Sequence, residues 1–172
     1  VACGLAVVSE YPAIVAVAVF MAGLLLGERE GRPARLSAFV LGGAPFAILL
    51  LVYNAILFGS PFTTAYAHES FPEWAEVASH GLFGIGWPTG SNLYLLMFSP
   101  SRGLFFFAPI LLLVLRDAWL HTAITLRQQV RWIALLLSLL AIAGHGAAHG
   151  GWTPGPRYLV FLLPLMLDPW LG

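Results

Sequence analysis

Long apolar runs separated by short polar connections make up most of the chain. A helix needs about 20 mainly apolar residues to cross a hydrocarbon layer of about 30 Å. By this criterion the pattern predicts about four and a half membrane segments, at residues 5–27, 36–58, 104–120, 132–149 and 157–172. The predicted fold class is therefore all-α, a polytopic transmembrane helix bundle forming one partial domain over residues 1–172.

The connection at residues 59–103 is much longer than the others and rich in proline, glycine and aromatic residues. Long loops in compact domains are usually functional or disordered, and the aromatic content argues against disorder. Residues 70–73 have the pattern of a capping box, which predicts a short helix ending near Gly81. Residues 92–98 are apolar enough to form a second short helix along the membrane interface.

Composition supports lipid as the solvent. Hydrophobic residues make up 59% of the chain and charged residues only 9%, with a mean hydropathy of +0.86, whereas soluble domains have about 25% charged residues. The net charge is zero, which argues against a nucleic-acid partner because such proteins carry a basic surface. The single cysteine, Cys3, excludes an internal disulfide and a multi-cysteine metal site.

Arginine placement predicts the orientation of the bundle, because short cytoplasmic loops carry an excess of Lys and Arg. Two short connections contain six of the eight basic residues, which are Arg29, Arg32, Arg35, Arg116, Arg127 and Arg131. Both connections are therefore predicted to be cytoplasmic. The loop at 59–103 and the turn at 146–157, which contain Arg102 and Arg157, are then predicted to lie on the outer face.

Arg102 and Arg157 each precede a predicted membrane segment at its outer end. The first turn of a helix has unpaired N–H groups and the positive end of the helix dipole, so an arginine there favours an anion. Guanidinium also binds phosphate through two parallel hydrogen bonds. If the two helix starts are neighbours, they would hold a phosphate at headgroup depth. The alternative is that each arginine only extends to lipid headgroups.

Other polar residues are candidates for the same outer site. Glu10 lies in an apolar run, where an ionisable group is costly and suggests function; it could face a cavity, pair with an arginine or remain protonated. His145 and His149 are four residues apart and would share a helix face, either as metal ligands or as the polar lining of an outer cavity. Glu69, beside His68 in the long loop, could orient an acceptor.

Two further features suggest helix packing rather than chemistry. Asn54 is predicted to form an interhelical hydrogen bond. Small residues allow close approach of helices, and four glycines are candidates for such contacts: Gly23, Gly27, Gly42 and Gly43.

Several short motifs occur in a distinctive order. They are Tyr53-Asn54, Phe58-Gly59-Ser60-Pro61-Phe62, Ser99-Pro100-Ser101-Arg102-Gly103-Leu104, Gly150-Gly151-Trp152 and Gly155-Pro156-Arg157-Tyr158. In this order they resemble prokaryotic membrane glycosyltransferases of the GT-C type, relatives of the protein mannosyltransferase and lipid A aminoarabinose transferase families.

The resemblance implies transfer of a sugar from a polyprenyl-phosphate donor to an unknown acceptor at the outer face of a prokaryotic inner membrane. Arg102 and Arg157 would hold the phosphate and stabilise its charge as it leaves. Four residues are further candidate substrate contacts: Tyr158, Glu10, Glu69 and His149. No cofactor is assigned, and a divalent metal is possible.

The chain begins and stops within apolar sequence, so we expect a C-terminal-side fragment of a membrane domain. The resemblance implies a catalytic carboxylate in a first outer loop upstream of Val1, and a fragment without that base would be inactive alone. Two alternatives are a transporter, which predicts broken helices and polar groups near the bilayer midplane, and a noncatalytic membrane scaffold, which would tolerate loss of Arg102 and Arg157.

Overall fold

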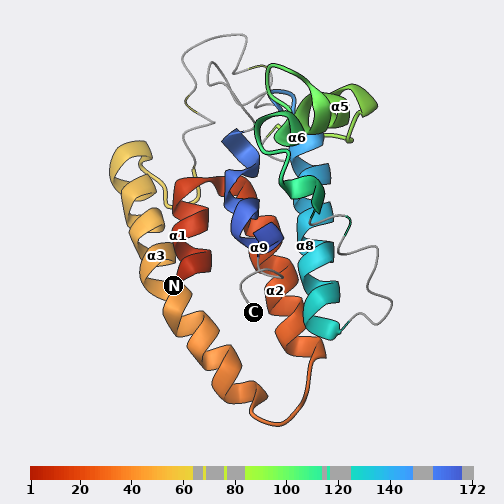
Figure 1. Cartoon of the computed structure of the whole chain (residues 1–172). Helices are drawn as coiled ribbons and strands as arrows, with labels where there is room; N and C mark the ends of the chain where they lie inside the picture. The colour runs from red at the N-terminus through yellow and green to blue at the C-terminus, as the bar shows by residue number, and fades with distance from the viewer. Residues whose placement is uncertain are drawn as a thin grey trace.

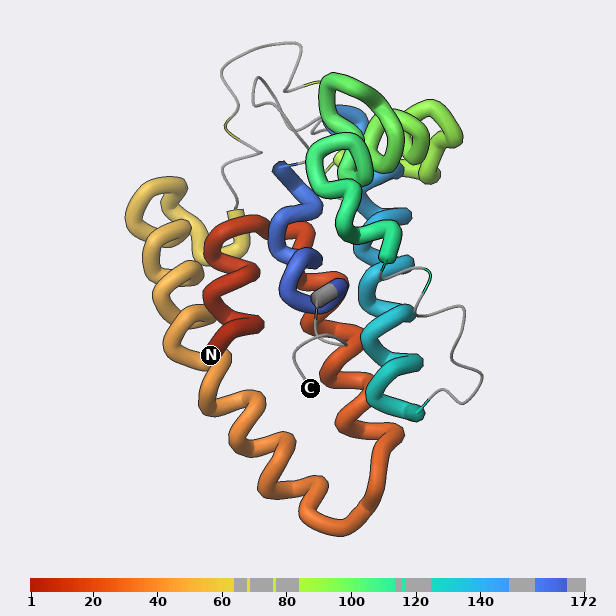
Figure 2. The backbone as a smooth tube through the Cα atoms, in the orientation of Figure 1, coloured from red at the N-terminus to blue at the C-terminus, as the bar shows by residue number. Residues whose placement is uncertain are grey.

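The computed structural model describes residues 1–63, 68, 76, 84–113, 116, 125–148 and 157–167, and most of them are helical. Figure 1 and Figure 2 show the arrangement. The helices are α1 (Ala2–Ser9), η1 (Tyr11–Ala13), α2 (Ile14–Leu26), α3 (Arg32–Phe58), α5 (Gly90–Phe98), α6 (Leu104–Phe107), α8 (Leu126–Ala143), η3 (Arg157–Leu162) and α9 (Leu163–Leu167). The all-α prediction is confirmed for this part of the chain.

The predicted segment at 5–27 is not one continuous helix. α1 ends at Ser9, Glu10 is extended (φ −149°, ψ 113°), and a 3-10 turn leads into α2. Pro12 explains the break, because a proline lacks an N–H donor and its ring clashes with the carbonyl group four residues before it, so α1 cannot continue through this position, whereas the first turn of the 3-10 helix accepts a proline. α1 rises to this break and α2 descends from it (Figure 1), so Glu10 lies at the tip of a helical hairpin.

α3 is the longest helix, with 27 residues and therefore a length of about 40 Å. It contains the predicted segment 36–58. Glycines in the left-handed conformation stand at both ends, Gly31 (φ 66°) and Gly59 (φ 73°), and Pro45 lies inside the helix. Side chains such as Leu41 and Ile56 are 70% and 75% exposed, so α3 presents a long apolar face outward.

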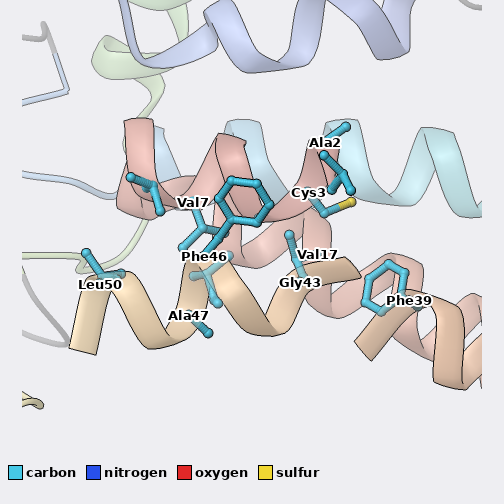
Figure 3. A pocket seen from close by; sticks show the side chains of 13 residues that line it. Ala2, Cys3, Val7, Val17, Phe39, Gly43, Phe46, Ala47 and Leu50 are labelled. Carbon is cyan, nitrogen blue, oxygen red and sulfur yellow. The ribbon is translucent and has the colours of Figure 1, made fainter. Parts of the chain in front are cut away.

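α1 packs closely against α3. A Cβ on Gly4 would lie 2.5 Å from the Phe46 ring, so only glycine allows the ring its position. Figure 3 shows Phe46 reaching from α3 toward α1 at a cavity of about 380 Å³, with Cys3 and Gly43 in its wall. Its lining is apolar apart from the Cys3 thiol, and it therefore offers packing space rather than chemistry.

α8 begins earlier and ends earlier than the predicted segment at 132–149. Thr125 and Gln128 form a reciprocal capping box at its start, which satisfies two N–H groups that a helix end otherwise leaves unpaired. Arg127 and Arg131 therefore lie within the first turns of α8, whereas the sequence placed them in the connection. Arg131 is only 8% exposed.

The glycine predictions have mixed outcomes. A Cβ on Gly23 would lie 2.7 Å from a methyl group of Val130, which confirms a close contact between α2 and α8. Gly42 approaches the chain start, with Val1 N 3.0 Å from a built Cβ, and the contact of Gly27 with Leu126 is an ordinary 3.7 Å. Gly43 has nothing within 4 Å, so close packing there was wrongly predicted.

The hydrophobic core joins α5, α6, α8, η3 and α9, with Leu96, Leu111, Ile142 and Leu159 almost fully buried. α5 confirms a helix at 92–98, beginning two residues earlier under a Thr89 cap. The described part of the segment predicted at 104–120 is not one helix. α6 ends at Phe107, because Ala108 (φ −136°, ψ 67°) precedes Pro109 and leaves helical conformation.

Two of the described helices, α3 and α8, are long and apolar enough to cross a membrane. Tyr11–Leu26 and Arg157–Met166 are apolar but shorter. Length and composition therefore suggest membrane association. The predicted helix from Ser70 to Gly81 lies almost entirely outside the described residues.

Candidate functional site

Polar residues from distant parts of the sequence gather at one end of the bundle. The ends of α1, α3 and α8 and the start of η3 lie together there (Figure 1). This polar end, as we call it, is defined by Glu10, Tyr11, Asn54, His145, Arg157 and Tyr158. The sequence predicted three of these as substrate contacts, namely Glu10, Arg157 and Tyr158.

Glu10 and Arg157 form an ion pair. Arg157 Nε donates to Glu10 Oε1 at 2.9 Å, and the two side chains are 54% and 18% exposed. Of the three possibilities considered for Glu10, the structure supports pairing with an arginine and facing a cavity. Because the pair is partly exposed, it contributes at most about 1 kcal/mol to stability. The pair therefore matters less for stability than for holding the two charged side chains at this place.

The pair lies at a cavity of about 530 Å³ between the arms of the hairpin, closed on the far side by η3 and α9. We call it the hairpin cavity. Its walls are mainly aliphatic and aromatic, from residues including Leu5, Phe20 and Phe161, and its polar groups are Ser9, Cys3 and the ion pair. An arginine beside an apolar cavity suits a molecule with an anionic head and a hydrocarbon tail.

His145 lies just beyond the end of α8 and is 8% exposed. Its backbone forms an isolated β-bridge with Ile85, and its Nδ1 accepts the Ala147 N–H at 3.0 Å. In the neutral ring the proton then resides on Nε2, which is a donor. The His145 ring lies 6.0 Å from that of Tyr158, so the residue after Arg157 contacts the end of α8.

Asn92 fixes this end of α8, a role that the sequence analysis missed. Its Nδ2 donates to the carbonyl oxygens of Ala143 (2.8 Å) and His145 (3.4 Å). The Ala143 carbonyl belongs to the last turn of α8, where a helix leaves its carbonyl groups without intrahelical partners, and the His145 carbonyl also accepts the Ala148 N–H at 3.0 Å. The Gly86 N–H also bonds to Gly144 O at 2.8 Å. Asn92 contacts residues more than 50 positions away, so local sequence carried no signal for it.

A second cavity of about 280 Å³ lies on the other side of the hairpin tip. Tyr11, Asn54 and His145 contribute its polar groups. Asn54 is 3% exposed; its Nδ2 donates to Pro61 O at 3.4 Å, whereas its Oδ1 has no hydrogen-bond partner in the described part of the chain. The predicted interhelical bond of Asn54 is therefore a local bond just beyond α3. His145 lines this cavity; that the cavity is on the outer side stays a prediction.

Arg102 belongs to a tight turn between α5 and α6. The Gly103 N–H bonds to Ser99 O at 2.6 Å, and a Cβ on Gly103 would overlap the Ser99 backbone, so glycine is required there. Arg102 precedes a helix of only four residues, and Arg157 begins a 3-10 helix; neither begins a long membrane helix. A joint phosphate clamp by these two arginines stays a prediction.

The metal hypothesis finds no support within the described residues, where no group of three or more His, Cys, Asp or Glu side chains could hold an ion. His145 stands outside α8, so the predicted sharing of one helix face with His149 was wrong. His149 and Glu69 themselves lie outside the described residues.

No protein-family model, curated protein or solved structure matches this chain.

Proposed function

We propose that this chain is the membrane part of a GT-C-like glycosyltransferase that transfers a sugar from a polyprenyl-phosphate donor. In this proposal the chain crosses a prokaryotic inner membrane several times, with the polar end and the loop at 59–103 on the outer side. The sequence resemblance supplies the reaction class. The observation that carries the proposal is the position of Arg157 at the hairpin cavity.

A polyprenyl phosphate combines a long hydrocarbon chain with an anionic head. The hairpin cavity offers apolar walls for the chain and, at Arg157, a guanidinium for the head. A guanidinium has five N–H donors, more than one carboxylate can use. The Glu10 carboxylate can therefore orient Arg157 through Nε at the edge of the hairpin cavity.

Glu10 also limits how tightly an anion can bind. Its charge offsets that of Arg157, so the pair alone attracts a phosphate weakly, and a second cation would strengthen binding. Arg102 is the sequence-based candidate for that second cation. The proposal therefore predicts that both arginines contribute to donor binding and that Arg157, beside the cavity, contributes more.

The direct test is Arg157→Ala in membranes from cells that express the gene. Removing one donor that stabilises charge in a transition state typically lowers the rate about 10²- to 10³-fold, and we expect a loss of that size in sugar transfer from polyprenyl-phosphate donors. Arg29→Ala, an arginine substitution in the connection between α2 and α3, is the matched control and should retain transfer. Normal transfer by Arg157→Ala, with membrane insertion intact, would contradict the phosphate role.

Cys3 gives an independent readout of donor binding, because this single cysteine lies in the wall of the hairpin cavity. A polyprenyl phosphate seated there should slow maleimide labelling of Cys3, and Arg157→Ala should abolish that protection. A short-chain isoprenyl phosphate should protect less. Equal labelling with and without the long-chain lipid would exclude the cavity as its site.

A transporter is a second candidate, favoured by one observation. The predicted segment at 5–27 is interrupted at a charged residue, Glu10, and transporter binding sites are typically formed by interrupted helices. The discriminating measurement is uptake of radiolabelled sugars into vesicles containing the protein, without a lipid donor. Flux that Glu10→Gln abolishes, with no sugar transfer in the same membranes, would replace the enzyme proposal.

A further inference from the structure

A fourth cavity lies at the opposite end of the bundle from Glu10 and Arg157. The last turn of α2 and the first turns of α3 and α8 meet there (Figure 1). The cavity measures about 560 Å³, within the size range of ordinary ligand sites. We call it the basic cavity, because Arg35 and Arg127 belong to its lining.

The basic cavity has apolar walls and a charged part. Phe20, Leu24, Phe39 and Val130 contribute the walls, and the charged side chains are Arg35, Arg127 and Glu28. The lining therefore combines two positive charges with one negative charge. A ligand that complements it has a hydrocarbon portion and a single negative charge.

The surrounding sequence extends this positive field. Residues 28–35 and 126–131 together contain five arginines and two glutamates, which gives them a net positive charge. Arg35 Nη2 also donates to the carbonyl oxygens of Glu28 (2.7 Å) and Glu30 (2.9 Å), so its position is fixed by the turn. Arg127 lies in the first turn of α8, where the helix dipole adds further attraction for an anion.

We propose that the basic cavity binds an anionic phospholipid, with the phosphodiester held by Arg127 and Arg35 and an acyl chain along the Phe20–Phe39 wall. Basic pockets between membrane helices are a recognised way to bind acidic lipid headgroups. A phosphodiester carries the single negative charge that the lining complements. This site lies at the other end of the bundle from the hairpin cavity; it rests on the membrane location in the proposed function and not on the glycosyltransferase reaction.

The test uses the purified chain in neutral detergent, titrated with phosphatidylglycerol or phosphatidylcholine and analysed by native mass spectrometry. We expect phosphatidylglycerol to be retained at least about tenfold more strongly than phosphatidylcholine, which lacks net charge. Arg127→Gln should remove most of that preference. Arg127→Lys should keep part of it, because the charge remains while the two-pronged geometry is lost.

Arg29→Gln is the matched control, because Arg29 lies in the connection between α2 and α3, close in sequence to Arg35, but outside the cavity lining. It should retain phosphatidylglycerol like the unaltered chain, and a loss equal to that of Arg127→Gln would show general surface attraction and overturn the site. Equal retention of the two lipids would also overturn it. Inorganic phosphate at the same concentration should not displace the lipid, since displacement would indicate a simple anion site without an acyl-chain groove.

Discussion

α3 and α8 are both long and apolar enough to cross a membrane, but their surroundings differ. Within the most apolar window of each helix, none of α3 is buried inside the protein, whereas 33% of α8 is. α8 packs against α2 and contributes to the hydrophobic core. The main neighbour of α3 is α1, followed by α2. Passing the length and hydropathy criterion for a membrane span therefore does not distinguish a helix with an exposed apolar face from one that forms part of a protein core.

The largest expected difference between the two helices comes from adding volume. Ala134 in α8 is completely buried, so Ala134→Leu should lower the free energy of unfolding by about 1–3 kcal/mol through overpacking. Ala38 in α3 is exposed, and Ala38→Leu should change the free energy of unfolding by less than about 0.5 kcal/mol. Unfolding in mixed micelles, followed by circular dichroism, measures both. Equal losses would show that α3 is as tightly enclosed as α8.

Glycine substitutions provide a second, smaller contrast. Gly23→Ala places a methyl group 2.7 Å from Val130, on α8, and should cost about 1–2 kcal/mol. Gly43 has open space around it, so Gly43→Ala should stabilise α3 by up to about 1 kcal/mol, the difference in helix propensity. The same unfolding assay applies. A stabilising Gly23→Ala would contradict the close contact between α2 and α8.

The smallest effect concerns how each helix begins. α8 starts with the Thr125 capping box, and α3 starts after Gly31 without a side-chain cap. Thr125→Ala should therefore cost about 1 kcal/mol, and Thr125→Ser, which keeps the hydroxyl group, should cost much less. Hydrogen exchange of the amides in the first turn of α8 would localise the change. Unaltered exchange would show that the cap does not control that turn.

The sequence predicted helical class and most of α3, because hydropathy over a long window determines both. The hairpin was not predicted, because the long apolar run at 5–27 suggested one continuous helix. Pro12 already indicated a break, since a proline interrupts a helix. The sequence analysis also placed Arg127 outside α8, although Thr125 and Gln128 already had the spacing of a capping box. In both cases a local motif was present in the sequence, but the hydropathy pattern over a longer window was given more weight.

The site was less predictable. Glu10 and Arg157 were each recognised as unusual, but nothing in a single sequence indicates that residues 147 positions apart form an ion pair. The unpartnered oxygen of Asn54 and the capping role of Asn92 likewise depend on tertiary packing. The two cavities beside the hairpin tip arise from the reversal at Glu10, and a straight segment would have lacked them.

The solvent around α3 is the property on which the membrane proposal depends. Spin labels at cysteines replacing Leu41, Ile48 and Ile56, in a Cys3→Ser background reconstituted in lipid, report collisions with oxygen and with a water-soluble nickel complex. We expect high oxygen and low nickel accessibility at all three positions, and the reverse at Glu30, which is exposed in the α2–α3 connection. Nickel accessibility on α3 equal to that at Glu30 would mean that the helix faces water and would contradict the membrane proposal.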